Sequence, residues 1–374
     1  MNHTQAPINR TAYDIQLLFP ALFLVGIGIV MVYSASSALA FKKFGSDYFF
    51  LKKQAMFTLA GVVVLVMCRH FPYKYYRYLA YPLLVLSVVF LIAVFIPHFG
   101  VSAGGAARWL RIGWLTFQPS ELARIALVIY LAYSLEKKGD RLKDFSVGFL
   151  PHIVILVIFA GLIVKQPDFG SIVILSALTG LMLFIGGVRI KHLFLSLMTL
   201  LPVGVYLLMS AEYRWKRVLG FIDPWQYPAA EGYQIVHSLM AFGTGGITGT
   251  GIGKGYQKLF YLPEPHTDFI FSVVGEELGL IGVIAIIGLY AWILVCGIRI
   301  AKNAGDQFGS FLAAGLTVAM GLQIVVNMGV ALSLLPTKGL TLPFLGYGGT
   351  SLLLNMASIG ILMNISASRQ NDSY

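Results

Sequence analysis

Long apolar stretches separated by short polar segments cover most of the chain. Stretches such as 17–33, 79–97 and 280–298 contain no charged residue. Each is close to the ~20 residues that a helix needs to cross a bilayer. We therefore expect an all-α, polytopic membrane protein in which residues 1–374 form a single membrane domain.

The pattern predicts about ten membrane-spanning helices. The expected spans lie near residues 14–35, 54–69, 76–97, 119–135, 147–165, 170–188, 192–210, 267–298, 309–334 and 346–367. An even number of spans places both termini on the same side of the membrane. The connection between the seventh and eighth spans, about 211–266, is much longer than the others and is expected to be a large extracytoplasmic loop.

Cationic residues favour cytoplasmic termini. The short connections on the terminal side hold Arg69, Lys74, Arg77, Lys137, Lys138, Arg141, Lys143, Arg189, Lys191, Arg299 and Lys302. Short cytoplasmic loops are enriched in Lys and Arg, whereas long loops carry little information about orientation. The opposite orientation is favoured by Lys42, Lys43, Lys52 and Lys53. We expect the termini in the cytoplasm and the connections 98–118 and 211–266 outside.

Composition agrees with a membrane location. Hydrophobic residues make up 57% of the chain and charged residues 11%, against about 25% charged in soluble domains. The net charge of +11 suits anionic headgroups and phosphate-bearing substrates on a membrane. No basic run with interleaved aromatic residues stands clear of the membrane, so we expect no nucleic-acid partner. Cys68 and Cys296 indicate neither a disulfide framework nor a metal site.

Ionisable residues gather at the start of the eighth expected span, in the sequence LPEPHTDFIFSVVGEELG of residues 262–279. They are Glu264, His266, Asp268, Glu276 and Glu277, in a chain with only 16 acidic residues. Carboxylates at membrane depth are costly and usually functional. Asp268 is either a helix N-cap or a functional carboxylate at the outer mouth of the span. Glu276 and Glu277 begin about two turns deeper, so we interpret them as support within the bundle.

Three further polar positions have both a structural and a functional interpretation. Glu121 suits the first turn of the fourth span, and Arg124 follows on the same face, so the two can pair. This pair either lets the span enter the membrane or forms the charged wall of an outward cavity. Asp168 is most simply the N-cap of the sixth span. Lys338 lies between two prolines in 335–344, where it either snorkels or lines a bent segment inside the protein.

Two parts of the long connection look structural. Residues 213–225 mix cations with aromatic residues, as an interfacial anchor does. Residues 243–255, GTGGITGTGIGKG, do not form a P-loop, because Thr248 replaces the upstream glycine and Gly255 replaces the Ser or Thr after the lysine. The glycines instead allow a tight backbone against a lipid-linked substrate or a neighbouring helix.

These segments together resemble the SEDS family (shape, elongation, division and sporulation). The motifs that carry the resemblance are ARWL at 107–110, QPSE at 118–121, QPDFG at 166–170, GYQ at 232–234, LPEPHTDFIF at 262–271, GEELG at 275–279 and LPTKGLTLPF at 335–344. They are spread over almost the whole chain. Within the family they are more similar to the division-type FtsW branch than to the elongation-type RodA branch, and a sporulation branch is also similar. Departures from the usual pattern occur at Arg124, Tyr256, Pro265 and Gly346.

The resemblance implies a peptidoglycan glycosyltransferase that polymerises lipid II at the outer face of the cytoplasmic (inner) membrane, for septal synthesis in cell division. It implies Asp268 as the general base and Arg124 and Lys338 as ligands of the diphosphate, with Arg108 and Arg214 as weaker candidates. Glu121 would position Arg124 or a bound cation, and Trp109 would stack on a sugar or cover the polyprenyl entrance. The supporting residues would be Gln118, Asp168, His266, Glu264, Glu276 and Glu277.

The resemblance also implies partners. These are a class B penicillin-binding transpeptidase and other membrane proteins of the division complex. Binding of a divalent cation by the outer acidic residues stays an open alternative, although the spacing of these residues matches no dedicated metal-binding loop. The alternatives are an elongation-type polymerase, a lipid II flippase and a non-catalytic scaffold. No inverted repeat of the kind that many transporters contain is visible between the two halves.

Overall fold

The computed structural model describes residues 14–103, 106–113, 115–259 and 265–369. Its α-helices are α1 (Ile15–Phe44), α2 (Phe49–His70), α3 (Tyr76–Ala93), α4 (Pro119–Lys138), α5 (Leu150–Lys165), α6 (Phe169–Ile185), α7 (Ile190–Met209), α8 (Glu212–Ile222), α9 (Tyr233–Gly245), α10 (Ile270–Lys302), α11 (Gln307–Ala331) and α12 (Gly349–Arg369). Strands β1 (Gly100–Ala103), β2 (Ala106–Ile112) and β3 (Leu115–Phe117) lie between α3 and α4. Short helices cover Tyr73–Tyr75, Gly139–Lys143 and Phe145–Phe149.

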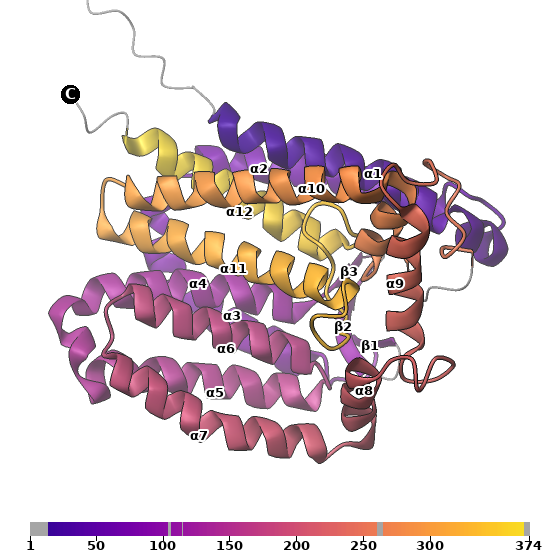
Figure 1. The fold of residues 1–374 in the computed structure, drawn as a ribbon. Helices are drawn as coiled ribbons and strands as arrows, with labels where there is room; N and C mark the ends of the chain where they lie inside the picture. The colour runs from indigo at the N-terminus through magenta and orange to yellow at the C-terminus, as the bar shows by residue number, and fades with distance from the viewer. Residues whose placement is uncertain (1–13, 104–105, 114, 260–264, 370–374) are drawn as a thin grey trace, which may run out of the picture.

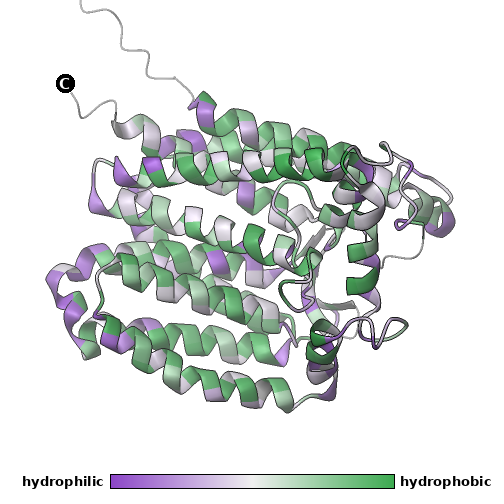
Figure 2. Cartoon of the chain, in the orientation of Figure 1, coloured by the Kyte–Doolittle hydropathy of each residue, from purple (hydrophilic) through white to green (hydrophobic). Residues whose placement is uncertain are grey.

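The long helices lie side by side in one bundle (Figure 1). The start of α1 and the end of α12 lie at one end of this bundle, and the strands, α8 and α9 lie at the other. Apolar residues cover the helices along their length, and hydrophilic residues gather at the helix ends (Figure 2). α7, for example, exposes Phe194, Leu197, Leu201 and Tyr206. An apolar exterior of this kind is suited to lipid rather than to water.

Every expected span coincides with a helix, but the helices differ in how well they fit a membrane crossing. Within the described parts of the chain, seven are long and apolar enough to cross: α1, α2, α3, the helical stretch Phe145–Lys165, α10, α11 and α12. α6 and α7 are apolar but shorter. α4 is buried along most of its length and contacts α3, α6, α11 and α12. Its partners in the bundle explain how a helix with Glu121 and Arg124 near its start is accommodated.

The ends of several helices follow from their local sequence. Pro119 occupies the first turn of α4, where its missing N–H is not needed. Asp306 caps α11, because its side chain accepts a hydrogen bond of 2.7 Å from the Gly309 N–H. Gly45 ends α1 in a left-handed conformation with φ of 70°.

The expectation of an all-α chain is wrong for residues 100–103, 106–112 and 115–117. They form an antiparallel sheet with strand order β1-β2-β3, in which Val101 pairs with Trp109 and Leu110 with Phe117. Gly113, with φ of 63°, makes the turn between β2 and β3. The segment is too short for another span, and pairing its strands satisfies the backbone hydrogen bonds at this end of the bundle.

The connection 211–266 is largely structured rather than a free loop. It contains α8 and α9, and the glycine-rich residues that follow α9 run along the first turns of α10. α10 itself bends at Gly279, which has φ of 64°. A Cβ at Gly279 would lie 2.3 Å from the Gly249 nitrogen, and a Cβ at Gly249 would lie 2.2 Å from the Glu277 carbonyl oxygen. Neither the glycine-rich segment nor α10 therefore has room for a side chain at this contact. The glycines therefore allow close backbone contact with a neighbouring helix.

Candidate active site

Residues 332–348, between α11 and α12, form a bent segment. The predicted site residues meet around this bent segment. Asn327 on α11 donates a hydrogen bond to the Leu340 carbonyl and another of 3.0 Å to the Asp268 carbonyl. The Tyr347 N–H donates to the His266 carbonyl at 2.8 Å. The bent segment is thus fastened to the residues just before α10, although the two are far apart in the sequence.

The Asp268 carboxylate and the Arg108 guanidinium lie next to Gly339 of this segment. A Cβ built on Gly339 would be 3.4 Å from Asp268 Oδ2 and 3.6 Å from Arg108 Nη1. Asp268 is partly exposed and Gly339 is exposed. Arg108 was expected only as a weaker candidate, yet it is a cation that lies beside the predicted base.

Arg108 is held in place by the turn before α6. It projects from β2 and donates hydrogen bonds to the carbonyls of Pro167 and, at 3.4 Å, Gln166. The Gln166 side chain in turn donates to the Leu91 carbonyl of α3 at 2.9 Å. The small sheet that the sequence did not predict is therefore the element that carries Arg108 to Asp268.

Lys338 lies beside the start of α6, where its charge interacts with that of Asp168. The stem of Lys338 packs on Gly170, whose added Cβ would lie 3.2 Å from Lys338 Cδ. Burial lowers the pKa of the Lys338 ammonium, and the charge of Asp168 partly opposes this shift. Asp168 also caps α6, accepting from the Ser171 N–H at 3.3 Å and from its hydroxyl at 2.7 Å. The predicted cap is confirmed, and Asp168 additionally lies near a predicted cation.

Arg124 and Glu121 form the expected ion pair beneath the bent segment. Arg124 Nη2 is 2.7 Å from Glu121 Oε2, and both side chains are buried. Arg124 Nη1 donates to Gln323 Oε1 of α11 at 2.6 Å, and Gln323 Nε2 donates to the Thr341 carbonyl at 2.9 Å. A cavity of about 10 Å³ beside the pair is also lined by Leu340, which is room for about one water molecule.

Other predicted residues border this centre. Arg214 of α8 lies over the Phe169 ring, 5.8 Å from its centroid. Trp109 is partly buried in β2, and Gln118 precedes α4 with its N–H donating to the Thr350 hydroxyl at 3.4 Å. His266 is buried against Phe50, and Glu264 lies outside the described residues. Desolvation, with a contribution from Lys43, lowers the pKa of His266 to about 4.

Glu276 and Glu277 bind the glycine-rich segment after α9. Glu276 accepts from the Tyr256 N–H at 2.7 Å, and Glu277 accepts from the Gly253 N–H at 3.0 Å. Glu277 also pairs with the buried Lys258 ammonium. Both carboxylates therefore have protein partners that account for their burial.

Sequence reasoning missed Gln323, Asn327 and Lys258. Gln323 and Asn327 are four residues apart in an apolar helix and therefore share one face. Both bind the bent segment through its carbonyls. That spacing was a usable signal, whereas Lys258 lies in an irregular segment whose burial no periodicity indicates. Within the described residues, no group of three His, Cys, Asp or Glu side chains is close enough to hold a metal ion.

Comparisons with known proteins agree with the motifs. A family model described as cell cycle protein, covering FtsW, RodA and SpoVE, matches residues 15–371. A probable peptidoglycan glycosyltransferase FtsW of Trichlorobacter lovleyi is 49% identical over 361 residues, which are 96% of this chain and 95% of that one. Stage V sporulation protein E of Bacillus subtilis is 40% identical, covering 96% of this chain and 98% of the other.

Solved structures share the fold over nearly the full length. A chain from a structure titled "Structural coordination of polymerization and crosslinking by a peptidoglycan synthase complex" has a TM-score of 0.79 and 29% identity, covering 96% of this chain and 98% of that one. The rod shape determining protein RodA of Thermus thermophilus has a TM-score of 0.71 and 28% identity, covering 97% and 99%. The chain belongs to the FtsW, RodA and SpoVE family of cell cycle proteins, which is the SEDS family that its motifs resemble.

Proposed function

We propose that this protein is a peptidoglycan glycosyltransferase that polymerises lipid II into glycan strands. The observation that carries the proposal is that the Asp268 carboxylate and the Arg108 guanidinium both lie beside Gly339. Lys338, a second cation, directly precedes Gly339 in the sequence. A proton acceptor and cations are the two kinds of group that this transfer requires. The name peptidoglycan glycosyltransferase borne by a relative that is 49% identical supports the same activity.

The reaction joins two sugars and releases a diphosphate. The 4-hydroxyl oxygen of an N-acetylglucosamine forms a bond to the anomeric carbon of the growing chain, while the bond from that carbon to the diphosphate oxygen breaks. Asp268 accepts the hydroxyl proton. The bonding electrons leave with the diphosphate, whose negative charge is stabilised by Arg108 and Lys338.

The remaining residues have supporting roles in this proposal. Arg124 is already bound to Glu121 and Gln323, so it contributes positive charge from beneath the bent segment and holds that segment in place. Arg214 on α8 adds a further positive charge beside those of Arg108, Lys338 and Arg124. Trp109 contacts a sugar or the polyprenyl chain, and Gln118, His266 and Glu264 shape the approach. A divalent cation would add to the same positive field.

The proposed orientation places this chemistry outside the cell. Ten helices, α1 to α7 and α10 to α12, cross the membrane, and both termini lie in the cytoplasm. The candidate site lies at the opposite end of the bundle from the start of α1 and the end of α12 (Figure 1). It therefore faces the outer side, where α8, α9 and the small sheet form its surroundings.

The proposed cellular role is septal wall synthesis together with a crosslinking partner. Relatives at 40–49% identity include proteins named FtsW and a sporulation protein, and a structural neighbour comes from a complex titled for polymerisation and crosslinking. A class B penicillin-binding transpeptidase is therefore the proposed partner at the septum, together with other membrane proteins of the division complex.

The proposal is tested by lipid II polymerisation with the purified full-length protein, alone and with its transpeptidase partner. We expect glycan strands from the wild type and none from Asp268→Ala or Asp268→Asn of equal thermal stability. Asp223→Ala is the matched control, because Asp223 is an exposed acid near α8 outside the site. Normal polymerisation by both Asp268 variants would refute Asp268 as the base. Movement of labelled lipid II across liposomes without polymerisation would support a flippase instead. Absence of both polymerisation and lipid II movement would support a non-catalytic scaffold.

A further inference from the structure

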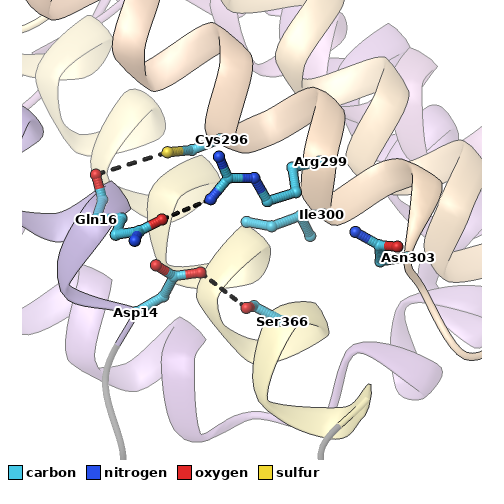
Figure 3. A pocket seen from close by; sticks show the side chains of 7 residues that line it. All are labelled: Asp14, Gln16, Cys296, Arg299, Ile300, Asn303 and Ser366. Atoms are coloured by element: carbon cyan, nitrogen blue, oxygen red, sulfur yellow. Dashed lines mark hydrogen bonds between the residues drawn. The ribbon is translucent and has the colours of Figure 1, made fainter.

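A second polar cavity lies at the end of the bundle where the described chain begins and ends. It has a volume of about 140 Å³. Its walls come from the start of α1 and the ends of α10 and α12 (Figure 3). The lining residues are Asp14, Gln16, Cys296, Arg299, Ile300, Asn303 and Ser366.

The cavity holds a carboxylate and a guanidinium that are not paired with each other. Asp14 Oδ2 accepts a hydrogen bond of 2.8 Å from the Ser366 hydroxyl, and Arg299 Nη1 donates one of 2.6 Å to Gln16 Oε1. Among the ion pairs of the described chain, none joins Asp14 to Arg299. Figure 3 shows both charged groups at the cavity, each bonded to a neutral partner.

This arrangement selects for a ligand that carries both charges. Among the residues that the structure describes, each charged group has one neutral hydrogen-bond partner, so Arg299 retains further N–H donors and Asp14 retains a second oxygen. Arg binds phosphate strongly through paired N–H groups. A primary ammonium offers three donors to a carboxylate. A molecule with a phosphate and a primary ammonium a few bonds apart therefore matches both walls.

The position of the cavity indicates where such a molecule comes from. α1, α10 and α12 are each long and apolar enough to cross a membrane, and the cavity lies where all three end. The ends of spanning helices lie at the level of the lipid headgroups. Ile300 and Cys296 supply an apolar side to the cavity. A phospholipid headgroup could thus enter while its acyl chains remain beside the helices.

We propose that this cavity binds the headgroup of a phosphatidylethanolamine-type lipid, with the phosphate at Arg299 and the ammonium at Asp14. Phosphatidylglycerol supplies the phosphate but no cation for Asp14. Phosphatidylcholine supplies both charges, but its quaternary ammonium has no N–H to donate. The proposal concerns a surface separate from the glycosyltransferase site and does not depend on that activity.

Native mass spectrometry of the full-length protein, titrated with each of the three lipids, tests this assignment. We expect the wild type to bind phosphatidylethanolamine about tenfold more tightly than the other two lipids, the effect of one charge-assisted hydrogen bond. Arg299→Gln should weaken binding of phosphatidylethanolamine and phosphatidylglycerol together. Asp14→Asn should remove the preference for phosphatidylethanolamine and raise the relative binding of phosphatidylglycerol. Lys302→Gln is the matched control, since Lys302 is an exposed cation on the same helix that does not line the cavity.

Two results of the lipid titrations would overturn the proposal. One is a wild type that binds phosphatidylglycerol at least as tightly as phosphatidylethanolamine. The other is an Asp14→Asn variant, folded by thermal melting, with an unchanged lipid preference. Soluble phosphoethanolamine should compete weakly, because it lacks the acyl chains that hold a headgroup at the helix ends. Full displacement at equal concentration would assign the cavity to a soluble zwitterion instead, and would also overturn the proposal.

Discussion

The Asp268 carboxylate and the Arg108 guanidinium approach the same point beside Gly339, at 3.4 Å and 3.6 Å from the position of an added Cβ. They arrive from separate elements, Asp268 from the turn before α10 and Arg108 from β2. The residue of the bent segment that lies next to both groups is a glycine, which has no side chain to fill the space beside them. In the proposed reaction this space is occupied by the reacting groups. The sugar hydroxyl gives its proton to Asp268, and the leaving diphosphate lies against Arg108.

Enlarging residue 339 should therefore block the site without unfolding the protein. An Ala Cβ at Gly339 would make only ordinary van der Waals contacts, and the position is exposed with no positive φ. We expect Gly339→Ala to polymerise lipid II at a rate close to that of the wild type. Gly339→Leu should lose at least about tenfold, because a small displacement of reacting groups is costly. The measurement is the initial polymerisation rate, with thermal melting of both variants as the control.

Equal rates for Gly339→Leu and Gly339→Ala would contradict this geometry. They would mean that the reacting sugars lie elsewhere along the bent segment. A loss in Gly339→Ala as large as that in Gly339→Leu would instead indicate that backbone freedom at this position matters.

The proposed role of Lys338 predicts a pH dependence. Burial lowers its pKa and the Asp168 charge opposes the shift, so the ammonium loses its proton below the usual pH for lysine. Polymerisation should fall as the pH rises through this lowered pKa. Asp168→Asn removes the opposing charge, so the alkaline fall should move to lower pH. Asn can still cap α6, which makes this a mild substitution. The measurement is a pH–rate profile for each protein.

Lys338→Arg is the matched control, because arginine stays protonated. It should retain measurable activity and lose the alkaline fall. If the fall is unchanged in both Asp168→Asn and Lys338→Arg, another group controls it and Lys338 has no charge-dependent role.

The helices and the motif-bearing segments could be predicted from the sequence, because long apolar runs and local caps are properties of neighbouring residues. Asp168 at the start of α6 is one such cap. The assignment of partners across the bundle could not be predicted. Arg108 rather than Arg124 lies beside Asp268 because a sheet of three short strands carries it there, and the isolated short strands give little periodic signal. Arg124 is engaged by Gln323 from a helix far along the chain.

His266 should make the protein sensitive to acid. Its pKa is lowered to about 4, against about 6.5 in an unfolded chain. The unfolded state therefore binds more protons between these two values, so stability is full above pH 6.5 and falls as the pH decreases toward 4, by about 3 kcal/mol in all. His266→Phe keeps an aromatic ring against Phe50 and Tyr347 and should remove most of this loss. The measurement is thermal melting in detergent across that pH range, and an unchanged acid sensitivity would contradict the assignment to His266.

Removing one partner of the buried ion pair between Lys258 and Glu277 should reduce the free energy of unfolding more than removing both charges. The two side chains are 5% and 0% exposed, and the Ser34 hydroxyl also donates to Glu277 at 2.7 Å. Glu277→Ala leaves an unpaired buried ammonium, which should cost about 3–5 kcal/mol of unfolding free energy. The double variant Lys258→Met with Glu277→Gln should recover much of this loss, because it removes both charges and keeps an acceptor for the Gly253 N–H. The exposed pair Lys216–Glu212 on α8 is the control, and breaking it should leave the unfolding free energy almost unchanged, because solvent screens exposed ion pairs. If unfolding in detergent shows equal losses for Glu277→Ala and the double variant, the unpaired Lys258 ammonium does not account for the loss, and the prediction is wrong.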